Sequence, residues 1–380
     1  MPWGNKTVES LRKEFVIAAK HTTNFSSLCR EFGITRKTGY KWVERAKHTD
    51  TLSDRSHARQ NISNKTDPEI ESLILAVRSS NPGWGGKTIR QVLLNQGYTN
   101  LPCEKTFNNI LKRNGCISLE ESIKHKPFVR FEKDLCNDMW QTDFKGDFAL
   151  LDGTRCFPLD ILDDHSRFSI KIASKPNTLG VTDSFREAFL EFGLPKSVLS
   201  DNGWTFRGLH GGYTHFEKWL MDHDVLPIHG RVRHPQTQGK IERFHRTMKT
   251  ELLNHHQFKD LQDADTLLQQ WRIKYNCIRP HEALGMKCPA QVYQPSSRTY
   301  HDDIKKYEYG GRHHVIKVNS WGYVRFDKFQ VYLSETMIGE YIEFRPNPLG
   351  DSFIACYRNF KIAEFSTETG KLINRTISRL

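Results

Sequence analysis

The stretch from His234 to Lys249 constrains the fold more than any other part of the chain; it reads His-Pro-Gln-Thr-Gln-Gly-Lys-Ile-Glu-Arg-Phe-His-Arg-Thr-Met-Lys. Proline and glycine near its start favour a loop. Three apolar residues then recur at helical spacing and predict one buried stripe: Ile241, Phe244 and Met248. Glu242, Arg246 and Lys249 share another face of this helix. A carboxylate in line with two cations suits a site that binds a metal and phosphate, although a solvated ion-pair face has the same pattern.

Two earlier acids stand where strands are predicted. Apolar and polar residues alternate over residues 140–144, which predicts a strand that carries Asp143. Because aspartate is disfavoured in strands, Asp143 requires either an edge position or a ligand role. Asp201 follows the short apolar run 197–200 and begins an Asp-Asn-Gly turn. Taken alone, each of these acids has an ordinary structural explanation.

The three acids together indicate a more specific chemistry. Asp143, Asp201 and Glu242 lie far apart in the chain and would form a site only if folding brought them together. Three neighbouring carboxylates cannot all stay ionised cheaply without cations. Their hard oxygen atoms select Mg²⁺ or Mn²⁺. Two such ions, about 3.5–4 Å apart, can activate an attacking oxygen and stabilise the leaving oxygen of a phosphodiester.

The motifs around these acids resemble those of a known family, the integrase-core transposases of bacterial insertion sequences, which are relatives of retroviral integrases. The motifs are Trp140-Gln-Thr-Asp143-Phe, Leu162-Asp-Asp-His-Ser-Arg167, Ser200-Asp201-Asn202-Gly203, His234 to Arg243, and Tyr275-Asn276 with Arg279-Pro280-His281. The resemblance covers residues 136–295 and implies an α/β RNase H-like catalytic core, a mixed sheet with flanking helices. It implies that Asp143, Asp201 and Glu242 are the catalytic, metal-binding triad and hold two Mg²⁺ (or Mn²⁺) ions.

The same resemblance implies a DDE-type transposase or integrase, which is a Mg-dependent polynucleotidyl transferase. Its partner would be double-stranded DNA, both the terminal inverted repeats of a mobile element and the target. Cleavage at the element's ends would free 3′-hydroxyl groups that are then joined to the target. Synapsis of two ends implies a homo-oligomer, either a dimer or a tetramer. Two alternatives are a metal-dependent nuclease of the same fold without strand transfer, and a DNA-binding repressor whose core is inactive.

Residues next to the triad are candidates for DNA contact within the core. By resemblance, Arg246 and Lys249 match the basic positions that follow the glutamate and meet DNA. His234 and Gln236 would frame the metals or touch DNA, and Lys240 is a further candidate. The gap between Asp201 and Glu242 is longer than is usual in the family, and residues 207–215 look like the insertion responsible. We expect a loop near the site there, with its role left open.

The first 48 residues predict a helix-turn-helix domain. The sequence predicts a short helix at Ser27–Phe32, a break at Gly33 and then a basic helix at Arg36–Ala46. Thr35 is expected to cap the basic helix. The net charge of +12 and the pI near 9.2 favour a polyanionic partner. The candidate DNA-binding residues are Arg36, Lys37, Tyr40, Lys41 and Arg45. A plain three-helix bundle with a charged surface remains the alternative, and a basic linker occupies residues 49–66.

Residues 67–116 predict a second helical domain that resembles a helix-turn-helix. Its helices are expected at Lys87–Gln96 and Pro102–Asn114. Its candidate DNA-binding residues are Lys105, Asn109 and Lys112. Trp84 could be a core residue or a wedge into DNA, and a core position is favoured. A second charged linker covers residues 117–135.

The core at 136–295 should contain a mixed sheet with crossover helices. Strands are predicted at Trp140–Phe148, Cys156–Asp163, Phe168–Ala173, Ser197–Ser200 and Val225–His229, and helices at Thr178–Phe192, His215–Asp224 and Asp260–Asn276. Asp163 and Asp164 are interpreted as turn formers. Residues 310–380 predict short strands in a small β-barrel, SH3-like by resemblance to integrase C-terminal domains. A structural β-cap without DNA contact is the alternative.

Several classes of protein are disfavoured by composition. The eight cysteines show no C-x-x-C pair or regular spacing, which argues against a disulfide framework or a zinc site and fits a reducing cytosol. The sequence shows neither a signal peptide nor an apolar run of membrane-spanning length. We therefore expect a cytoplasmic, bacterial nucleoid-associated protein with no membrane partner.

Overall fold

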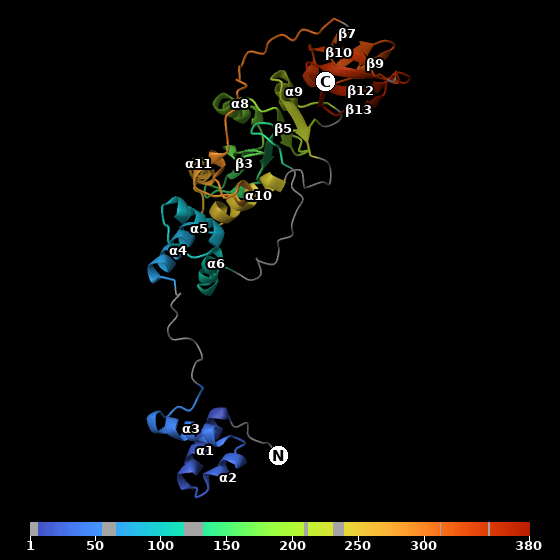
Figure 1. Cartoon of the computed structure of the whole chain (residues 1–380). Coiled ribbons are helices and arrows are strands. Elements are labelled where there is room, and N and C mark those ends of the chain that lie inside the picture. Colours follow the sequence, from blue (N-terminus) through green and yellow to red (C-terminus); the bar gives the residue numbers. More distant parts are fainter. Residues whose placement is uncertain are drawn as a thin grey trace. The chain divides into compact units, whose positions relative to one another are not determined.

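The computed structural model describes residues 7–54, 66–117, 132–208, 212–230, 239–311, 313–348 and 350–380. The chain separates into two compact units, Met1–Lys65 and Thr66–Leu380, and Figure 1 shows the elements of each. Within the described residues, no helix is long and apolar enough to cross a membrane.

The first unit consists of three short helices, as the sequence predicts. They are α1 (Val8–His21), α2 (Phe25–Glu31) and α3 (Arg36–His48). The Thr35 side chain caps α3 by accepting from the backbone N–H of Thr38 at 3.2 Å. Gly39 lets α3 approach the other two helices closely, because a Cβ there would lie 2.8 Å from Sγ of Cys29. Trp42 on the same helix is buried in the core.

The second unit begins with another three-helix group. Its helices are α4 (Pro68–Ser80), α5 (Gly86–Asn95) and α6 (Glu104–Arg113). Ile74, Ile89 and Phe107 form its fully buried centre. Trp84 is 2% exposed and belongs to this core. The prediction of a core role for Trp84 is therefore confirmed.

The predicted catalytic core, here called the catalytic region, contains a six-stranded mixed sheet in the order β2-β3-β1-β5-β6, with β4 paired to β3. The strands are β1 (Trp140–Phe144), β2 (Phe148–Ala149), β3 (Arg155–Asp163), β4 (Ser169–Lys175), β5 (Ser197–Ser200) and β6 (Leu226–His229). Strand β1 runs antiparallel to β3 and parallel to β5. The predicted strand 140–148 is broken, because Gly146 adopts a φ of +86° that extended backbone does not have.

Helices cover both faces of this sheet (Figure 1). They are α8 (Val181–Phe192), α9 (His215–Asp222), α10 (Gly239–Met248), a π-helical turn (Lys249–Leu253), α11 (Leu261–Cys277) and two 3-10 turns (Glu282–Leu284 and Pro289–Gln291). Leu159 and Ile161 of β3 pack towards α8 and α9. Leu162 packs towards α10 and α11 on the other face. The alternation along β3 therefore directs Asp160 to the α10 face.

The C-terminal region, residues 310–380, is here called the β domain. Its strands are β7 (His314–Lys317), β8 (Tyr323–Phe326), β9 (Phe329–Tyr332), β10 (Tyr341–Pro346), β11 (Ser352–Tyr357), β12 (Phe360–Ser366), β13 (Leu372–Asn374) and β14 (Ser378–Arg379), with a 3-10 turn at Glu335–Met337. They form a six-stranded antiparallel sheet and a separate β8–β9 hairpin. Ile342, Phe344 and Phe353 belong to one buried core. The predicted short strands are confirmed as antiparallel sheets.

Candidate active site

Asp143 and Asp201 come together through the pairing of two parallel strands. Trp140 pairs with Val198 and Gln141 with Leu199. Two positions further along, this register brings Asp143 level with Asp201 at the strand ends. Burial raises the pKa of Asp143 to about 6, and the negative charge of Asp201 also raises it. The two predicted acids are therefore electrostatic neighbours.

A third acid, Asp160, adjoins this pair and was missed at the sequence level. It is the cross-strand partner of Asp143 in the β1–β3 pairing and is fully buried. Burial raises the pKa of the Asp160 carboxyl group. The available signal was a charged residue inside the apolar run Leu159-Asp-Ile-Leu162. Because a buried carboxylate requires a partner, such a residue indicates a specific contact.

That contact is made by His245 on α10, which is also buried. Its Nε2 lies 2.8 Å from Oδ2 of Asp160, and its Nδ1 lies 3.9 Å from Oδ2 of Asp143. The 2.8 Å approach is a close polar contact, and among the described residues neither Asp160 oxygen has another hydrogen-bond partner. The imidazole of His245 thus contacts both acids. His245 belongs to the motif that carries Glu242, but the sequence alone assigned it no role.

Glu242 lies in the first turn of α10, one turn before His245, and is exposed. In the parts of the chain that the structure describes, no three His, Cys, Asp or Glu side chains are grouped closely enough to hold a metal. The closed three-carboxylate cluster expected from the sequence is thus not formed there. His234 and Gln236 lie outside the described residues, as does the whole segment that leads into α10.

The chemistry of the acid pair nevertheless fits a divalent cation. Burial and the acidic neighbours Asp201 and Asp160 destabilise the charged form of Asp143 and raise its pKa to about 6. A bound cation would relieve this electrostatic cost. Carboxylate oxygens are the ligands that Mg²⁺ and Mn²⁺ prefer. Glu242, on the helix that contacts Asp143 through His245, can add a further oxygen donor.

The start of α10 is anchored to the sheet by a buried polar network. The Lys240 ammonium donates to the backbone carbonyl of Asp164 at 3.0 Å and pairs with its carboxylate. Gln141 donates to Oδ1 of Asp164 at 2.7 Å and accepts from the backbone N–H of Ile241 at 3.3 Å. Lys240, predicted to contact DNA, is therefore engaged with a buried acid. Its position indicates an anchoring role for α10.

The two acids interpreted as turn formers are confirmed in that role. Asp163 ends β3 and accepts from the backbone N–H of Ser166 at 2.8 Å. Asp164 follows in the turn and is fully buried. Asp164 also accepts hydrogen bonds from Gln141 and Lys240, which goes beyond turn formation, and no sequence pattern indicated these distant partners.

Two other predicted DNA-contact residues of the core, Arg246 and Lys249, lie on the surface. Arg246 is exposed on α10. Lys249 is also exposed, but it begins the π-helical turn that follows α10. The face shared by Glu242, Arg246 and Lys249 is therefore interrupted at its end, because the helical spacing changes there.

The predicted DNA-contact residues of the helical groups are mostly exposed. Arg36, Lys37 and Lys41 are exposed on α3, and Lys105, Asn109 and Lys112 on α6. Tyr40 is 53% exposed and stacks on Phe25, with ring centroids 4.3 Å apart. Arg45 is half-buried, with its guanidinium 5.2 Å from the centroid of the Trp42 ring. Four of the five α3 candidates thus present side chains to solvent, whereas Arg45 covers an apolar ring.

Glu251 joins the second helical group to the far end of α10. The indole N–H groups of Trp84 and Trp271 donate to its two carboxylate oxygens at 3.1 Å and 3.2 Å. The Arg279 guanidinium donates to the same carboxylate at 2.8 Å. The helical group α4–α6 is therefore attached to the catalytic region through a nearly buried acid that lies directly after α10.

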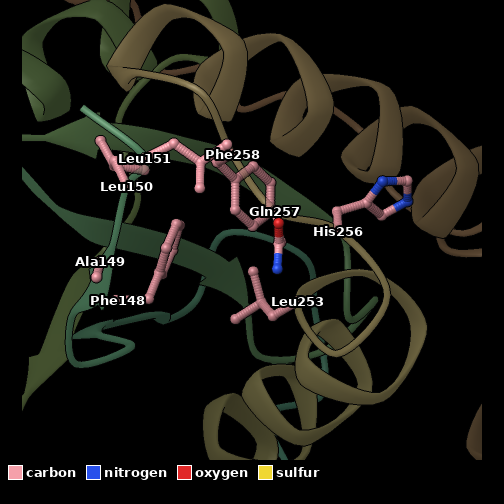
Figure 2. Close-up of a pocket in the computed structure, with 8 residues that line it drawn as sticks. All are labelled: Phe148, Ala149, Leu150, Leu151, Leu253, His256, Gln257 and Phe258. Carbon is pink, nitrogen blue, oxygen red and sulfur yellow. The ribbon is translucent and has the colours of Figure 1, made fainter. Parts of the chain in front are cut away.

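An apolar hollow of about 280 Å³ lies beside the β2–β3 hairpin (Figure 2). It is lined by Phe148, Ala149, Leu150, Leu151, Leu253, His256, Gln257 and Phe258. None of Asp143, Asp201 and Glu242 takes part in its lining. The hollow is therefore separate from the acid pair, and it lacks the acidic groups that metal-dependent chemistry requires.

Known protein families match the part of the chain that carries Asp143, Asp201 and Glu242. Integrase core domain families match residues 135–235 and 223–289, and a helix-turn-helix domain family matches residues 11–60. The uncharacterized protein of insertion element IS476 from Xanthomonas euvesicatoria is 34% identical over 157 residues, 41% of this chain and 44% of that protein. The corresponding protein of IS407 from Burkholderia multivorans is 30% identical over 159 residues, 41% of this chain and 54% of its own. The matched stretch spans about half of each relative.

Two solved structures show a low overall similarity to this chain. The catalytic core domain of HTLV-2 integrase, solved with magnesium in a trimeric form, has a TM-score of 0.33 at 19% identity, and covers 42% of this chain and 99% of that one. An intasome of simian T-cell lymphotropic virus, solved with the PP2A regulatory subunit B56 gamma, has a TM-score of 0.37 at 15% identity. It covers 82% of this chain and 98% of that one.

Proposed function

We propose that this chain is a DNA transposase of the DDE type, because integrase core domain families match its residues 135–235 and 223–289 and uncharacterized proteins of bacterial insertion elements are similar to it. It would bind the terminal inverted repeats of its mobile element, cleave a phosphodiester at each end and join the freed 3′-hydroxyl to target DNA. One observation carries the proposal. Asp143 and Asp201 lie level on neighbouring strands, beneath the helix that bears Glu242.

The proposed chemistry assigns a role to each acid. Asp143, Asp201 and Glu242 would hold two Mg²⁺ (or Mn²⁺) ions. When bound, these ions would activate the attacking oxygen and stabilise the leaving oxygen. The sheet holds Asp143 and Asp201 side by side, and His245 orients α10 over them. The attacking group would be water in the first step and the new 3′-hydroxyl in the second.

The remaining parts of the chain would bind DNA and assemble the complex. Residues 11–60 match a helix-turn-helix family, and the exposed Arg36, Lys37, Tyr40 and Lys41 of α3 would meet the inverted repeats. We propose that the β domain is an SH3-like barrel that also meets DNA. Synapsis of two ends would require a dimer or tetramer. The expected location is the cytoplasm, in association with the nucleoid.

An Asp201→Asn variant tests the assignment of the acid pair. It should abolish Mg²⁺-dependent cleavage of a labelled duplex taken from the DNA that borders the coding sequence. Binding to the same duplex, followed by mobility shift, should stay nearly intact because α3 and α6 are distant in sequence from the acids. Cleavage by this variant in Mg²⁺ would refute the proposed site.

A joining assay separates this function from that of a nuclease of the same fold. A duplex that already ends in the recessed 3′-hydroxyl is offered together with a supercoiled plasmid. A transposase should produce covalently joined product, whereas a nuclease should only nick the plasmid. An inactive repressor would do neither, and the presence of Asp143 and Asp201 at neighbouring strand ends argues against that alternative because a repressor has no use for such a pair.

A further inference from the structure

The segment between Asp201 and α9 leaves the catalytic region and returns to it. Phe206 belongs to the aromatic core of that region, with its ring 5.9 Å from Phe144. Thr214 caps α9 and its hydroxyl donates to the Phe206 carbonyl at 3.4 Å. The base of the excursion is thus closed on the catalytic core, although residues 209–211 lie outside the described part. The sequence had left its role open.

Tyr213, at the end of this excursion, is buried in the β domain. It is 5% exposed and belongs to the same hydrophobic cluster as Leu333, Ile342 and Ile362. Its hydroxyl donates to the Ile362 carbonyl at 2.6 Å, and its backbone N–H donates to Oγ of Ser334 at 2.9 Å. A residue from the Asp201 loop therefore completes the core of the C-terminal domain.

Helix α9 adds a second set of contacts to the β domain. Asp222, whose side chain is 4% exposed, accepts from the Tyr357 hydroxyl and pairs with Arg358 Nε at 3.1 Å. Lys218 pairs with Asp222 and with Glu340, both at 2.8 Å. The buried Tyr213 and these partly buried ion pairs therefore join the β domain to the α9 side of the catalytic region at two places.

The same helix is linked to the backbone of Asp201. Glu217, 3% exposed, accepts from the backbone N–H groups of Thr214 at 2.7 Å and Gly208 at 3.2 Å. Its other oxygen lies 2.8 Å from Nε2 of His229. The Nδ1 of His229 lies 3.2 Å from Oγ of Ser200, whose hydroxyl donates to the Asp201 carbonyl at 3.2 Å. Buried polar contacts therefore run from the base of the Tyr213 excursion to Asp201.

We infer that Tyr213 and Glu217 are positioning residues for the joining reaction, an inference that rests on the proposed function. Tyr213 holds the β domain on the loop of Asp201, and Glu217 transmits that position to the acid through His229 and Ser200. The β domain and Asp201 then move as one body, so DNA bound by the β domain keeps a fixed relation to the acid pair. Misplacement of a reactant by about 1 Å can cost about a hundredfold in rate.

Hydrogen–deuterium exchange of the full-length protein tests the coupling directly. Tyr213→Ala should speed exchange in the peptide 197–208 by about tenfold or more, while peptides of β11 stay protected. Tyr213→Phe keeps the ring and should have a much smaller effect. Asp224→Asn is the matched control, because Asp224 contacts Arg379 at the edge of the same interface and asparagine tolerates its φ of +56°. It should leave peptide 197–208 unchanged.

The ratio of joining to cleavage supplies a readout that a loss of stability alone would not move. Tyr213→Ala should reduce joining about tenfold more than cleavage, because only joining requires two DNA segments in fixed relation. Should that variant fail to fold, Glu217→Gln takes its place, because its single amide oxygen cannot accept both from His229 and from the backbone N–H groups of Thr214 and Gly208, while Tyr213 stays buried. Wild-type exchange in peptide 197–208, or an unchanged ratio, would overturn the inference. A wild-type protein that neither cuts nor joins would refute the proposed function, and the exchange measurement would still decide the coupling.

Discussion

The strand side and the helix side of the acid site are held by different forces. Asp143, Asp160 and Asp201 owe their proximity to backbone pairing between β3, β1 and β5. Glu242 and His245 lie on α10, which side chains hold in place through the Asp164 network at its start and Glu251 beyond its end. Strand register cannot change without flipping every side chain, whereas a helix held by side chains can shift slightly. The helix side should therefore be the adjustable half of the site.

The largest expected effect concerns the one acid on the adjustable side. If Glu242 completes the metal site, Glu242→Gln should lower the cleavage rate by about 10²–10³-fold, a loss comparable to that of a preorganised electrostatic group. The measurement is single-turnover cleavage in Mg²⁺ of the labelled duplex. Glu282→Gln, on a surface turn outside the acid site, is the control and should cleave normally. Full activity of Glu242→Gln would show that cleavage depends only on the acids of the strand side and not on Glu242.

His245 tests whether the helix side depends on a buried contact. His245→Ala leaves the buried Asp160 carboxyl group without the imidazole that contacts it, so the free energy of unfolding should fall by about 3 kcal/mol at pH 7. Protonation of Asp160, whose pKa is already raised, limits the loss. Urea unfolding measures it, with the exposed His256→Ala as control. A change below about 1 kcal/mol would show that α10 does not depend on this pair.

The raised pKa of Asp143 should make cation binding on the strand side depend on pH. Because its pKa is raised to about 6, the carboxyl group is protonated below that pH and must lose a proton to bind a cation. The affinity for Mn²⁺, followed by electron paramagnetic resonance, should therefore fall by up to about tenfold per pH unit below 6 and level off above it. An affinity independent of pH between 5 and 7 would contradict the proposed role of Asp143.

The smallest expected effect concerns the hydrogen bond between Trp84 and Glu251, which lies just beyond α10. Trp84→Phe removes the hydrogen bond to Glu251 but keeps an aromatic ring, so it should cost about 1 kcal/mol of unfolding free energy. Trp42→Phe is a matched substitution of a buried tryptophan in the first unit. If cleavage falls in Trp84→Phe but not in Trp42→Phe, the position of α10 at the acid site depends on the contact between Trp84 and Glu251. Equal cleavage in both would show that this contact matters only for stability.

Local sequence patterns determined much of the fold. The apolar spacing of Ile241, Phe244 and Met248 predicted the helix that buries them. Thr35 predicted the start of α3, and the apolar run before Asp201 predicted β5 with an acid at its end. These features follow from periodicity and capping, which are properties of neighbouring residues. They can therefore be recognised without knowledge of the partner surface.

Only the tertiary structure decided which distant groups meet. The pairing of Asp160 with His245, the burial of Lys240 against Asp164 and the insertion of Tyr213 into the β domain each join residues from separate elements. A sequence pattern reports that a side chain is polar, but its partner across a sheet or a domain interface depends on strand register and packing. For the same reason the sequence identified three acids but not their arrangement. The fold places Asp143 and Asp201 side by side, and His245 connects α10 to the sheet.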